Sequence, residues 1–401
     1  MCFKRSTPHL DEMGNSSSAG SSSQSPKNAS SPPPPNPRIV EAFNRLSGGE
    51  ENISFENFQN VFGIQLSACM WKHFQGNCAE STSLSRYNFF KGAEVLLHGS
   101  SDAYLRIILP AESVLACCFE ARKISVRESD KQFLDSLKKD MTAKDDTFES
   151  VAQWKNTVCP RICCPVETKI LDILLHRSRS ADEISSDILS PAQLLILSLC
   201  LPTTVYFPHN EANTTDERNL NTQWTKLYSS ASQGISINRF EHNCFSYKGA
   251  TIAIFKLTNN QVFAIATDQE WRHSIKKFGG PHSLLFQLHP SFERIDVESP
   301  AIYCNLKNRS AGALGLRYGN VLSIDGDMSN VGDMEVWGCG GKGTFEEQQK
   351  QKLWLKQQAE KNSKVPLPGN WEGNPDKQLL EMAGFQFSNE RKFDRPDDSM
   401  K

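Results

Sequence analysis

The chain of 401 residues has room for two or three domains, and 38% apolar residues are enough for ordinary hydrophobic cores. A net charge of −2 without a long basic run argues against nucleic-acid binding. No stretch approaches the roughly 18 apolar residues of a membrane span, and the N-terminus has no apolar signal region. We therefore expect a reducing compartment, in which the 12 cysteines are thiols rather than disulfides.

Residues 1–37 are rich in serine and proline and hold almost no large apolar side chains after Leu10. Such a segment cannot bury enough apolar surface to offset the entropy lost on ordering, so we expect it to be disordered. Within it, Pro32–Pro35 is expected to form a stiffer, extended spacer.

Residues 38–187 carry apolar side chains at helical spacing, beginning with two adjacent helix–loop–helix units that suggest a pair of EF-hands. A calcium loop needs oxygen ligands at positions 1, 3 and 5 and a glutamate at position 12. With Ile53 at position 8, positions 1, 3 and 12 hold Leu46, Gly48 and Asn57. With Leu84 at position 8, they hold Asn77, Ala79 and Asn88. The region is therefore predicted to be a helical scaffold that binds calcium poorly.

The periodicity predicts five further helices and then a short apolar core helix: Ala103–Leu109, Val114–Ala121, Lys131–Lys139, Thr147–Val158, Thr168–Leu175 and Leu194–Leu201. Residues 188–340 are richer in β-branched and aromatic side chains. Ile252–Leu257 and Val262–Thr267 are predicted to form a hairpin, because the asparagines of the turn between them tolerate positive φ. Further strands are predicted at Ser283–Leu288, Ala301–Asn305 and Asp333–Trp337.

Residues 341–401 are predicted to form a helical tail. Thr344 and Glu347 match a capping box, so a helix is expected from there to about Asn362. This helix is polar nearly all round, apart from Phe345 and the consecutive Leu353, Trp354 and Leu355, which suggests that it bridges to something else or is weakly held. A second helix is expected between Asn374 as N-cap and Gly384 at C′.

Three blocks of the β-rich region, residues 223–240, 249–271 and 313–338, together resemble the TLDc domain of the oxidation-resistance proteins. The similarity is carried by an opening motif, a central hairpin and closing strands: Trp224, Leu227, Tyr228, Gly234–Ser236 and Phe240, then Ala250–Thr267, then Leu314–Leu316 and Glu335–Trp337. The chain is most similar to the mTOR-associated branch, which has degenerate EF-hand-like helices first and a short helix resembling Gln378–Gly384 last.

Two departures from the family pattern stand out. Phe263 is followed by Ala264-Ile265-Ala266 where the family usually has paired glycines. Only eighteen residues, rich in Gly and Asp, separate Leu316 from Glu335, where the family has a longer loop. Any contact that the family makes through that loop is therefore not expected to transfer.

The resemblance implies an α+β chain, in which the helical region is followed by a TLDc β-sandwich with peripheral helices and by the helical tail. It also implies binding to subunits of the vacuolar proton-pumping ATPase, with links to TOR-pathway proteins, and neither an established reaction nor a cofactor. The tail side chains expected to make the partner contact are Trp354, Trp371, Leu379 and Leu380. Packing of these side chains onto the chain's own domain is the alternative.

The residues offer few candidates for catalysis or metal binding. Cys159, Cys163 and Cys164 form the densest thiol cluster, but a zinc site needs paired motifs and more ligands. His242 and Cys244 would share a face of a strand, yet a nucleophilic pair needs direct contact and an orienting group. We therefore predict neither a catalytic residue nor a metal site.

Two loops are also predicted to bind neither a cation nor a phosphate group. Asp325 and Asp327 lack further oxygen ligands for a cation and are predicted to form a solvated turn. The glycine-rich Gly338–Gly343 lacks the spacing of a phosphate-binding loop and is interpreted as a flexible joint before the tail.

A lipidation signal lies near the N-terminus. Met13-Gly14-Asn15-Ser16-Ser17-Ser18 fits the N-myristoylation pattern if translation starts at Met13, which would make Gly14 the acylated residue. One myristoyl chain anchors only marginally, so membrane contact would be reversible and would need a protein partner.

The sequence therefore predicts a non-enzymatic regulatory adaptor in the cytoplasm, peripheral on lysosomal or plasma membranes. The alternative is an oxidative-stress protein that acts through its thiols. A transcriptional coregulator, suggested by other family members, is a third hypothesis and has no support from the weakly charged composition.

Overall fold

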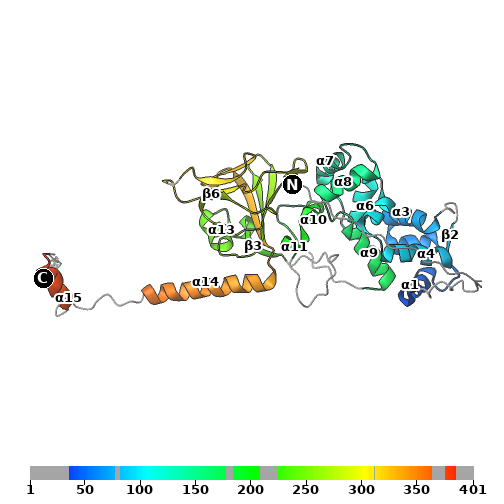
Figure 1. Cartoon of the computed structure of the whole chain (residues 1–401), viewed down its shortest axis with the longest axis horizontal. Helices are drawn as coiled ribbons and strands as arrows, with labels where there is room; N and C mark the ends of the chain where they lie inside the picture. Colours follow the sequence, from blue (N-terminus) through cyan, green and yellow to red (C-terminus); the bar gives the residue numbers. More distant parts are fainter. Residues whose placement is uncertain are drawn as a thin grey trace, which may run out of the picture.

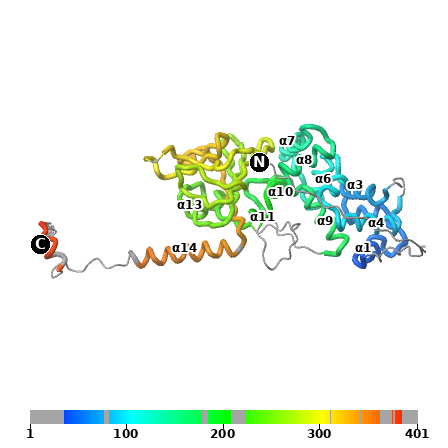
Figure 2. The backbone as a smooth tube through the Cα atoms, viewed as in Figure 1, coloured from blue at the N-terminus to red at the C-terminus, as the bar shows by residue number. Residues whose placement is uncertain are grey.

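The computed structural model describes residues 36–76, 82–177, 184–207, 224–310, 312–363 and 375–384. A helical part comes first, a β-sandwich follows, and one long helix projects from the sandwich (Figures 1 and 2). This order confirms the predicted α+β class. Within the described ranges, no helix is long and apolar enough to cross a membrane. The disorder predicted for residues 1–37 falls almost entirely outside these ranges.

The helical part contains two short strands, one 3₁₀ turn (Glu128–Asp130) and a series of packed helices. Its strands are β1 (Asn52–Ser54) and β2 (Ser83–Ser85), and its helices are α1 (Pro37–Ser47), α2 (Phe55–Phe62), α3 (Ile64–Gln75), α4 (Arg86–Leu97), α5 (Ser101–Ile108), α6 (Ala111–Ala121), α7 (Lys131–Met141), α8 (Phe148–Thr157) and α9 (Cys164–Leu175). The predicted helices of this region are confirmed, with ends that differ by up to four residues.

The EF-hand-like pairing is confirmed by the short strands. β1 and β2 run antiparallel, and Ile53 lies opposite Leu84. These are the two residues that the sequence places at equivalent loop positions. Each strand leads into a helix whose N-cap serine, Ser54 or Ser85, accepts a hydrogen bond from the backbone N–H three residues later.

One partly buried connection between helices involves Glu120 near the end of α6. Its carboxylate accepts hydrogen bonds from the backbone N–H groups of Ile64 at 2.7 Å, Gln65 at 3.1 Å and Leu66 at 2.8 Å. These are first-turn amides of α3, which have no partner within the helix and favour a negative charge. Glu120 therefore caps α3 from another helix and holds α3 against α6.

Replacing Glu120 by alanine is expected to lower the free energy of unfolding by about 1–3 kcal/mol, because three amides lose a charged acceptor. Urea unfolding followed by circular dichroism measures the change. Glu112→Ala on the same helix is the matched control, since that exposed carboxylate forms a surface ion pair with Lys138 and its loss should cost less than about 1 kcal/mol. Equal destabilisation by both variants would contradict the capping role.

The sandwich consists of two antiparallel sheets. The six-stranded sheet has the order β3-β12-β4-β5-β7-β8, with β3 (Thr225–Ser229), β12 (Val331–Gly338), β4 (Thr251–Leu257), β5 (Val262–Thr267), β7 (Leu284–His289) and β8 (Glu293–Ile295). The four-stranded sheet has the order β11-β10-β9-β6, with β11 (Leu322–Asp325), β10 (Gly315–Tyr318), β9 (Ile302–Asn305) and β6 (Ser274–Phe278). The predicted hairpin is β4–β5, and Asn260 in its turn has a φ of 65°.

Both faces of the six-stranded sheet are covered. Alternate residues of the central strands, such as Phe255 and Ile265, pack toward the four-stranded sheet. Their neighbours Ile254, Ala264 and Ala266 belong to the core formed with the helices. This explains why β4 and β5 have continuous apolar sequences rather than an alternation of apolar and polar residues.

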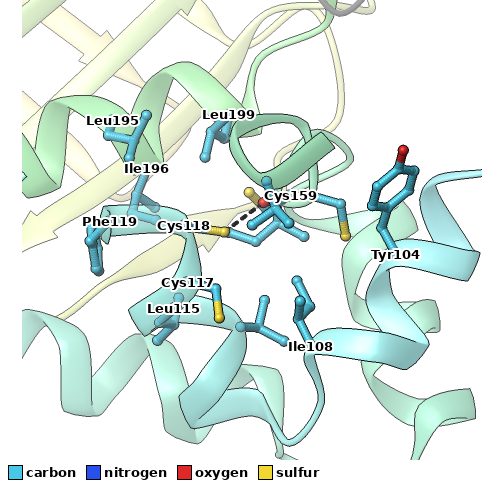
Figure 3. Packing of buried hydrophobic residues seen from close by; sticks show 14 of the residues in the cluster. Tyr104, Ile108, Leu115, Cys117, Cys118, Phe119, Cys159, Leu195, Ile196 and Leu199 are labelled. Atoms are coloured by element: carbon cyan, nitrogen blue, oxygen red, sulfur yellow. Dashed lines mark hydrogen bonds between the residues drawn. The ribbon is translucent and has the colours of Figure 1, made fainter. Parts of the chain in front are cut away.

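Helix α10 (Pro191–Cys200) lies between the sheet and the helical part. The Gln193 side chain donates a hydrogen bond of 2.9 Å to the Leu288 carbonyl of β7. In Figure 3, Leu195 and Ile196 of α10 lie near Cys118 and Phe119 of α6. The helical part and the sandwich therefore share one continuous core.

A second contact joins α7 to the other end of that sheet. Phe133 packs edge-on against Phe292 with ring centroids 5.8 Å apart, and the Phe292 N–H donates to Ser136 Oγ at 2.6 Å. Arg294 of β8 donates to the Thr157 carbonyl at the end of α8. These contacts fix the edge strand against the helices.

Three short helices complete the sandwich: α11 (Thr203–Tyr206), α12 (Ser230–Gln233) and α13 (Ile237–Cys244). The tail contains α14 (Gly341–Ser363) and α15 (Pro375–Met382). The predicted second tail helix is thus confirmed, while its predicted N-cap Asn374 lies outside the described residues.

The capping box predicted at Thr344 and Glu347 is wrong. Helix α14 already begins at Gly341, and the Thr344 hydroxyl donates to the Gly340 carbonyl at 2.8 Å. The interpretation of residues 338–343 as a flexible joint is also wrong. Gly338 ends β12, and a Cβ atom there would lie 2.5 Å from the Tyr247 ring. These glycines allow close packing, so β12 continues into α14 almost without a loop.

Candidate partner-binding surface

The first turns of α14 are fixed to the sandwich. Gln348 is 2% exposed and its side-chain amide donates to the Asn243 carbonyl at 2.8 Å and to Ser246 Oγ at 3.1 Å. Phe345 packs against the core between the two sheets. Lys352 is half-buried beside Cys244, and burial lowers the pKa of its ammonium group. Helix α14 is therefore anchored along α13 up to residue 352.

Beyond this anchor, three consecutive apolar side chains are exposed. The exposed fractions are 58% for Leu353, 57% for Trp354 and 50% for Leu355. Because successive helical residues are rotated by about 100°, the three side chains cover much of the helix circumference. Packing of Trp354 onto the chain's own domain, the alternative interpretation, is therefore not observed. We call Leu353, Trp354 and Leu355 the apolar triplet.

The charges next to the apolar triplet are mainly basic. Lys350 and Lys356 flank it and are exposed. Figure 1 shows this half of α14 projecting away from the sandwich. Exposed contiguous apolar side chains with a polar rim are typical of a protein–protein contact. The sequence already contains the signal, an apolar run in an otherwise polar helix, although only Trp354 is selected from it.

The other candidate tail residues lie on a different helix or outside the described ranges. On α15, Leu379 is 64% exposed and Leu380 is half-buried. Met382, which the sequence reasoning does not select, is 84% exposed. Trp371 and the acylation candidate Gly14 lie outside the described residues. Among the described candidates, Trp354 on α14 is therefore separated from Leu379 and Leu380 on α15.

The first EF-hand-like loop has a buried apolar residue where a calcium ligand would be. Leu46 at position 1 is 1% exposed and belongs to the core. In the part of the chain that the structure describes, no group of three or more His, Cys, Asp or Glu side chains is placed to hold a metal. Positions 1 and 3 of the second loop, Asn77 and Ala79, fall outside that part.

Calcium is expected to leave thermal stability unchanged. A loop with micromolar affinity would gain about 4 kcal/mol at 1 mM calcium, which raises the melting temperature of a domain of this size by several degrees. Differential scanning fluorimetry in 1 mM calcium, with EDTA and 1 mM magnesium as controls, should show a shift of less than about 1 °C. A calcium-specific rise of several degrees would show that the loops bind.

The thiol cluster near residue 160 is part of the core. Cys159 and Cys163 are fully buried, and burial raises the pKa of both thiols, that of Cys163 to about 12. Cys118 of α6 donates its S–H to the Ile162 carbonyl at 2.8 Å (Figure 3). Protonated buried thiols are poor nucleophiles and poor metal ligands, so these cysteines have a packing role.

The other predicted candidates are also structural. His242 and Cys244 lie on helix α13 rather than on a strand, so residues two apart point to different sides. Cys244 is buried, which raises the pKa of its thiol. The Asp325–Asp327 turn is closed by its own bonds: the Ser329 N–H donates to Asp327 at 3.0 Å and the Ser329 hydroxyl to Asp325 at 3.2 Å.

A buried charge cluster, which the sequence reasoning misses, fastens the start of the sandwich. Glu335 of β12 is fully buried and lies 2.8 Å from the Lys226 ammonium group, which also lies 2.9 Å from Asp187. The Ser186 hydroxyl donates to the second oxygen of Glu335 at 2.5 Å. The cluster ties residues 184–189 to strands β3 and β12, and its charged groups pair with one another within the chain.

Comparison with known proteins agrees with this architecture. Residues 183–334 match the model of the TLDc domain. Relatives include three yeast proteins named Restriction of telomere capping protein 5. The protein of Kluyveromyces lactis is 22% identical over 60% of this chain and 56% of its own length. The protein of Zygosaccharomyces rouxii is 28% identical over 31% of this chain and 29% of its own length. The protein of Lachancea thermotolerans is 21% identical over 71% of this chain and 68% of its own length. The chain thus spans about half or less of the first two relatives.

Proposed function

Because residues 183–334 form a TLDc domain, we propose that this chain is a non-enzymatic regulatory adaptor that binds the vacuolar proton-pumping ATPase. The choice of partner rests on the resemblance to the TLDc family. The observation that carries the proposal is the exposed apolar triplet on a helix whose first turns are fixed to the sandwich. In this proposal the sandwich docks on the pump and α14 adds a second contact.

The anchoring of α14 favours binding. The helix extends about 16 Å beyond residue 352, since each residue adds about 1.5 Å. A contact helix that is already folded and oriented loses less conformational entropy on association than a disordered tail would. Tryptophan is also among the side chains that contribute most to interfaces when fully desolvated. Trp354 is accordingly the central contact in this proposal.

The flanking lysines indicate the charge of the surface that receives the helix. Lys350 and Lys356 are exposed beside the apolar triplet, and neither makes an ion pair within the described residues. An apolar groove with acidic residues at its rim would match this arrangement. Reversal of both lysines to glutamate would then slow association more than it speeds dissociation.

The proposal also covers where the chain acts and which signalling pathway it joins. Binding to the pump would place the chain in the cytoplasm on lysosomal membranes, or on the plasma membrane, in contact with TOR-pathway or insulin-type signalling. Acylation at Gly14, in a form that starts at Met13, would add a weak membrane anchor.

Affinity capture tests the partner. The full chain, tagged at its C-terminus, is incubated with detergent-solubilised lysosomal membranes, and retained proteins are identified by mass spectrometry. Pump subunits should be enriched over a capture with a tagged protein of similar size and charge. Recovery of no pump subunit at protein concentrations in the micromolar range would remove the proposal.

A role in oxidative stress through thiols is the alternative, and one observation favours it. Among the described cysteines, Cys69 and Cys164 are half-buried rather than buried. If the chain protects cells through thiol chemistry, replacing all 12 cysteines by serine or alanine should abolish protection against peroxide. Unchanged protection would dismiss this alternative.

A further inference from the structure

The edge strand β6 presents three consecutive side chains to solvent. In a regular strand, side chains alternate between the two faces, so at least one of any three would point into the sandwich. Ile275 is 58% exposed, and Lys276 and Lys277 are also exposed. The pairing of β6 with β9 is irregular between Ser274 and Phe278, and the Ser274 hydroxyl donates to the Lys276 carbonyl at 2.6 Å. This bulge turns all three side chains outward.

Further basic side chains lie beside the bulge. The Leu306 N–H, just after β9, donates to Nδ1 of His273, just before β6, at 3.5 Å. The chain neighbours of these two residues, Lys307 and Arg272, are exposed, as is Arg309 in the loop that follows. The two stretches of chain therefore form one surface. We call it the basic edge, and it consists of Arg272, Ile275, Lys276, Lys277, Lys307 and Arg309.

The segments that form the basic edge contain no acidic residue. Residues 271–292 and 299–324 hold six Lys and Arg and no Asp or Glu, whereas the whole chain has 46 acidic and 44 basic residues. Glu270 and Glu298 border the two segments in the sequence. Positive charge is thus concentrated on one part of a chain that is close to neutral.

The basic edge lies on the side of the sandwich away from the helical part. The six-stranded sheet packs on the helical part with one face and on the four-stranded sheet, to which β6 belongs, with the other. Figure 1 shows β6 on the side of the sandwich away from α10. Among the ranges that the structure describes, Lys307 alone of the basic edge forms an ion pair, with the buried Glu241. The other charges are available to a partner.

Protection of an edge strand explains only part of this arrangement. Lysines and a bulge prevent an edge strand from pairing with another sheet. Ile275 works against that purpose, because an exposed apolar side chain on an edge promotes aggregation. An apolar side chain among basic ones instead matches an anionic bilayer. The apolar side chain can enter the headgroup region while the cations lie close to the lipid anions.

We propose that the basic edge docks on anionic lipid membranes, with Ile275 inserted among the headgroups. This contact extends the proposed membrane location, but it requires neither the pump nor acylation at Gly14. A single acyl chain anchors only weakly, and a basic surface is the kind of second signal that makes anchoring stable. Each Lys or Arg near an anionic membrane strengthens binding about fivefold.

Sedimentation with protein-free vesicles tests the proposal. The purified, unacylated full chain is incubated with vesicles of phosphatidylcholine alone or with about 30% phosphatidylserine, and bound chain is separated by centrifugation. Binding to the anionic vesicles should be at least about tenfold tighter, and about 0.5 M salt should release the chain. Equal binding to both kinds of vesicle, or binding to neither, would overturn the proposal.

Charge reversal locates the surface. Lys276→Glu with Lys277→Glu should weaken binding to the anionic vesicles by about tenfold or more. Lys72→Glu with Lys91→Glu is the matched control, because these lysines are exposed on α3 and α4 and their reversal changes the net charge equally. The control should bind within about threefold of the wild type. Equal weakening by both double variants would show that only the overall charge matters.

Two further measurements distinguish the occupant. Ile275→Ser should weaken vesicle binding several-fold and leave its salt dependence unchanged, since the charges remain. Polyglutamate and a short DNA duplex represent acidic proteins and nucleic acids, and tighter binding to either than to the vesicles would overturn the proposal. The vesicles contain no pump, so failure here leaves the proposed binding to the pump untouched. The wild-type comparison of the two vesicles decides even if a variant misfolds.

Discussion

Replacing Leu353, Trp354 and Leu355 together by alanine is expected to weaken binding to the vacuolar proton pump by roughly tenfold or more, as expected for loss of a central aromatic contact. The fold should not change, because each of the three side chains is at least half exposed and none belongs to the buried core. Alanine also has the highest helix propensity, so α14 itself is retained. Binding is measured by titrating purified pump with fluorescently labelled chain, and unfolding is followed by circular dichroism.

The matched control replaces exposed apolar residues elsewhere. Tyr87 and Val95 on α4 are 74% and 53% exposed, so Tyr87→Ala with Val95→Ala removes exposed apolar side chains from the helical part, which the proposal does not place at the pump. This double variant should bind like the wild type. Equal affinity of the triple variant and the wild type would show that α14 does not contribute to the contact.

Replacing Gly338 by alanine is expected to destabilise the chain by about 1–3 kcal/mol, because it overpacks the junction between β12 and α14. The added Cβ atom would lie 2.5 Å from Tyr247 Cζ and 2.8 Å from its hydroxyl oxygen. Tyr247 is fully buried, and its hydroxyl accepts a hydrogen bond from the Gly340 N–H at 2.6 Å, so the ring cannot move without loss of that bond. Urea unfolding measures the change.

Gly343→Ala provides the control for this variant. A Cβ atom at Gly343 would meet nothing within 4 Å, and the residue lies inside α14. Alanine there should stabilise the helix by up to about 1 kcal/mol, since glycine is a poor helix former. Opposite signs for the two variants indicate close packing at Gly338 rather than a general need for flexibility. If both variants were neutral, the junction would be as loose as the sequence suggests.

Local patterns in the sequence predict much of the fold. The β4–β5 hairpin follows from two apolar runs around an asparagine turn, and Asn260 adopts the positive φ that such a turn requires. The EF-hand-like pairing follows from spacing alone, since Ile53 and Leu84 occupy equivalent positions and lie opposite each other. Periodicity is decisive in these segments because each buries its side chains against near neighbours.

Features that depend on distant contacts are not predictable in this way. The glycines at the end of β12 suggest flexibility from their sequence alone. In the structure, Gly338 and Gly340 pack closely against Tyr247, which lies some ninety residues earlier in the chain. Helix α3 is capped by Glu120 rather than by its own N-cap residue.

The candidate partner-binding surface is only partly predictable from the sequence. A polar helix with three consecutive apolar residues already suggests a contact site, and the exposure of Trp354 agrees with it. The sequence does not indicate that the helix is fixed as far as residue 352, because that depends on Gln348 reaching backbone and hydroxyl groups around α13. Anchoring turns a weakly held helix into a preoriented one.

Photo-crosslinking from the apolar triplet tests the central claim most directly. The full chain is produced with p-benzoylphenylalanine in place of Trp354, bound to lysosomal membranes and irradiated, and the crosslinked peptides are sequenced by mass spectrometry. The same photoreactive residue in place of Tyr87, which is 74% exposed on α4, is the control position. We predict crosslinks from position 354, and not from position 87, to a subunit of the proton pump. Crosslinks from position 354 only to the chain itself or to other membrane proteins would contradict the account.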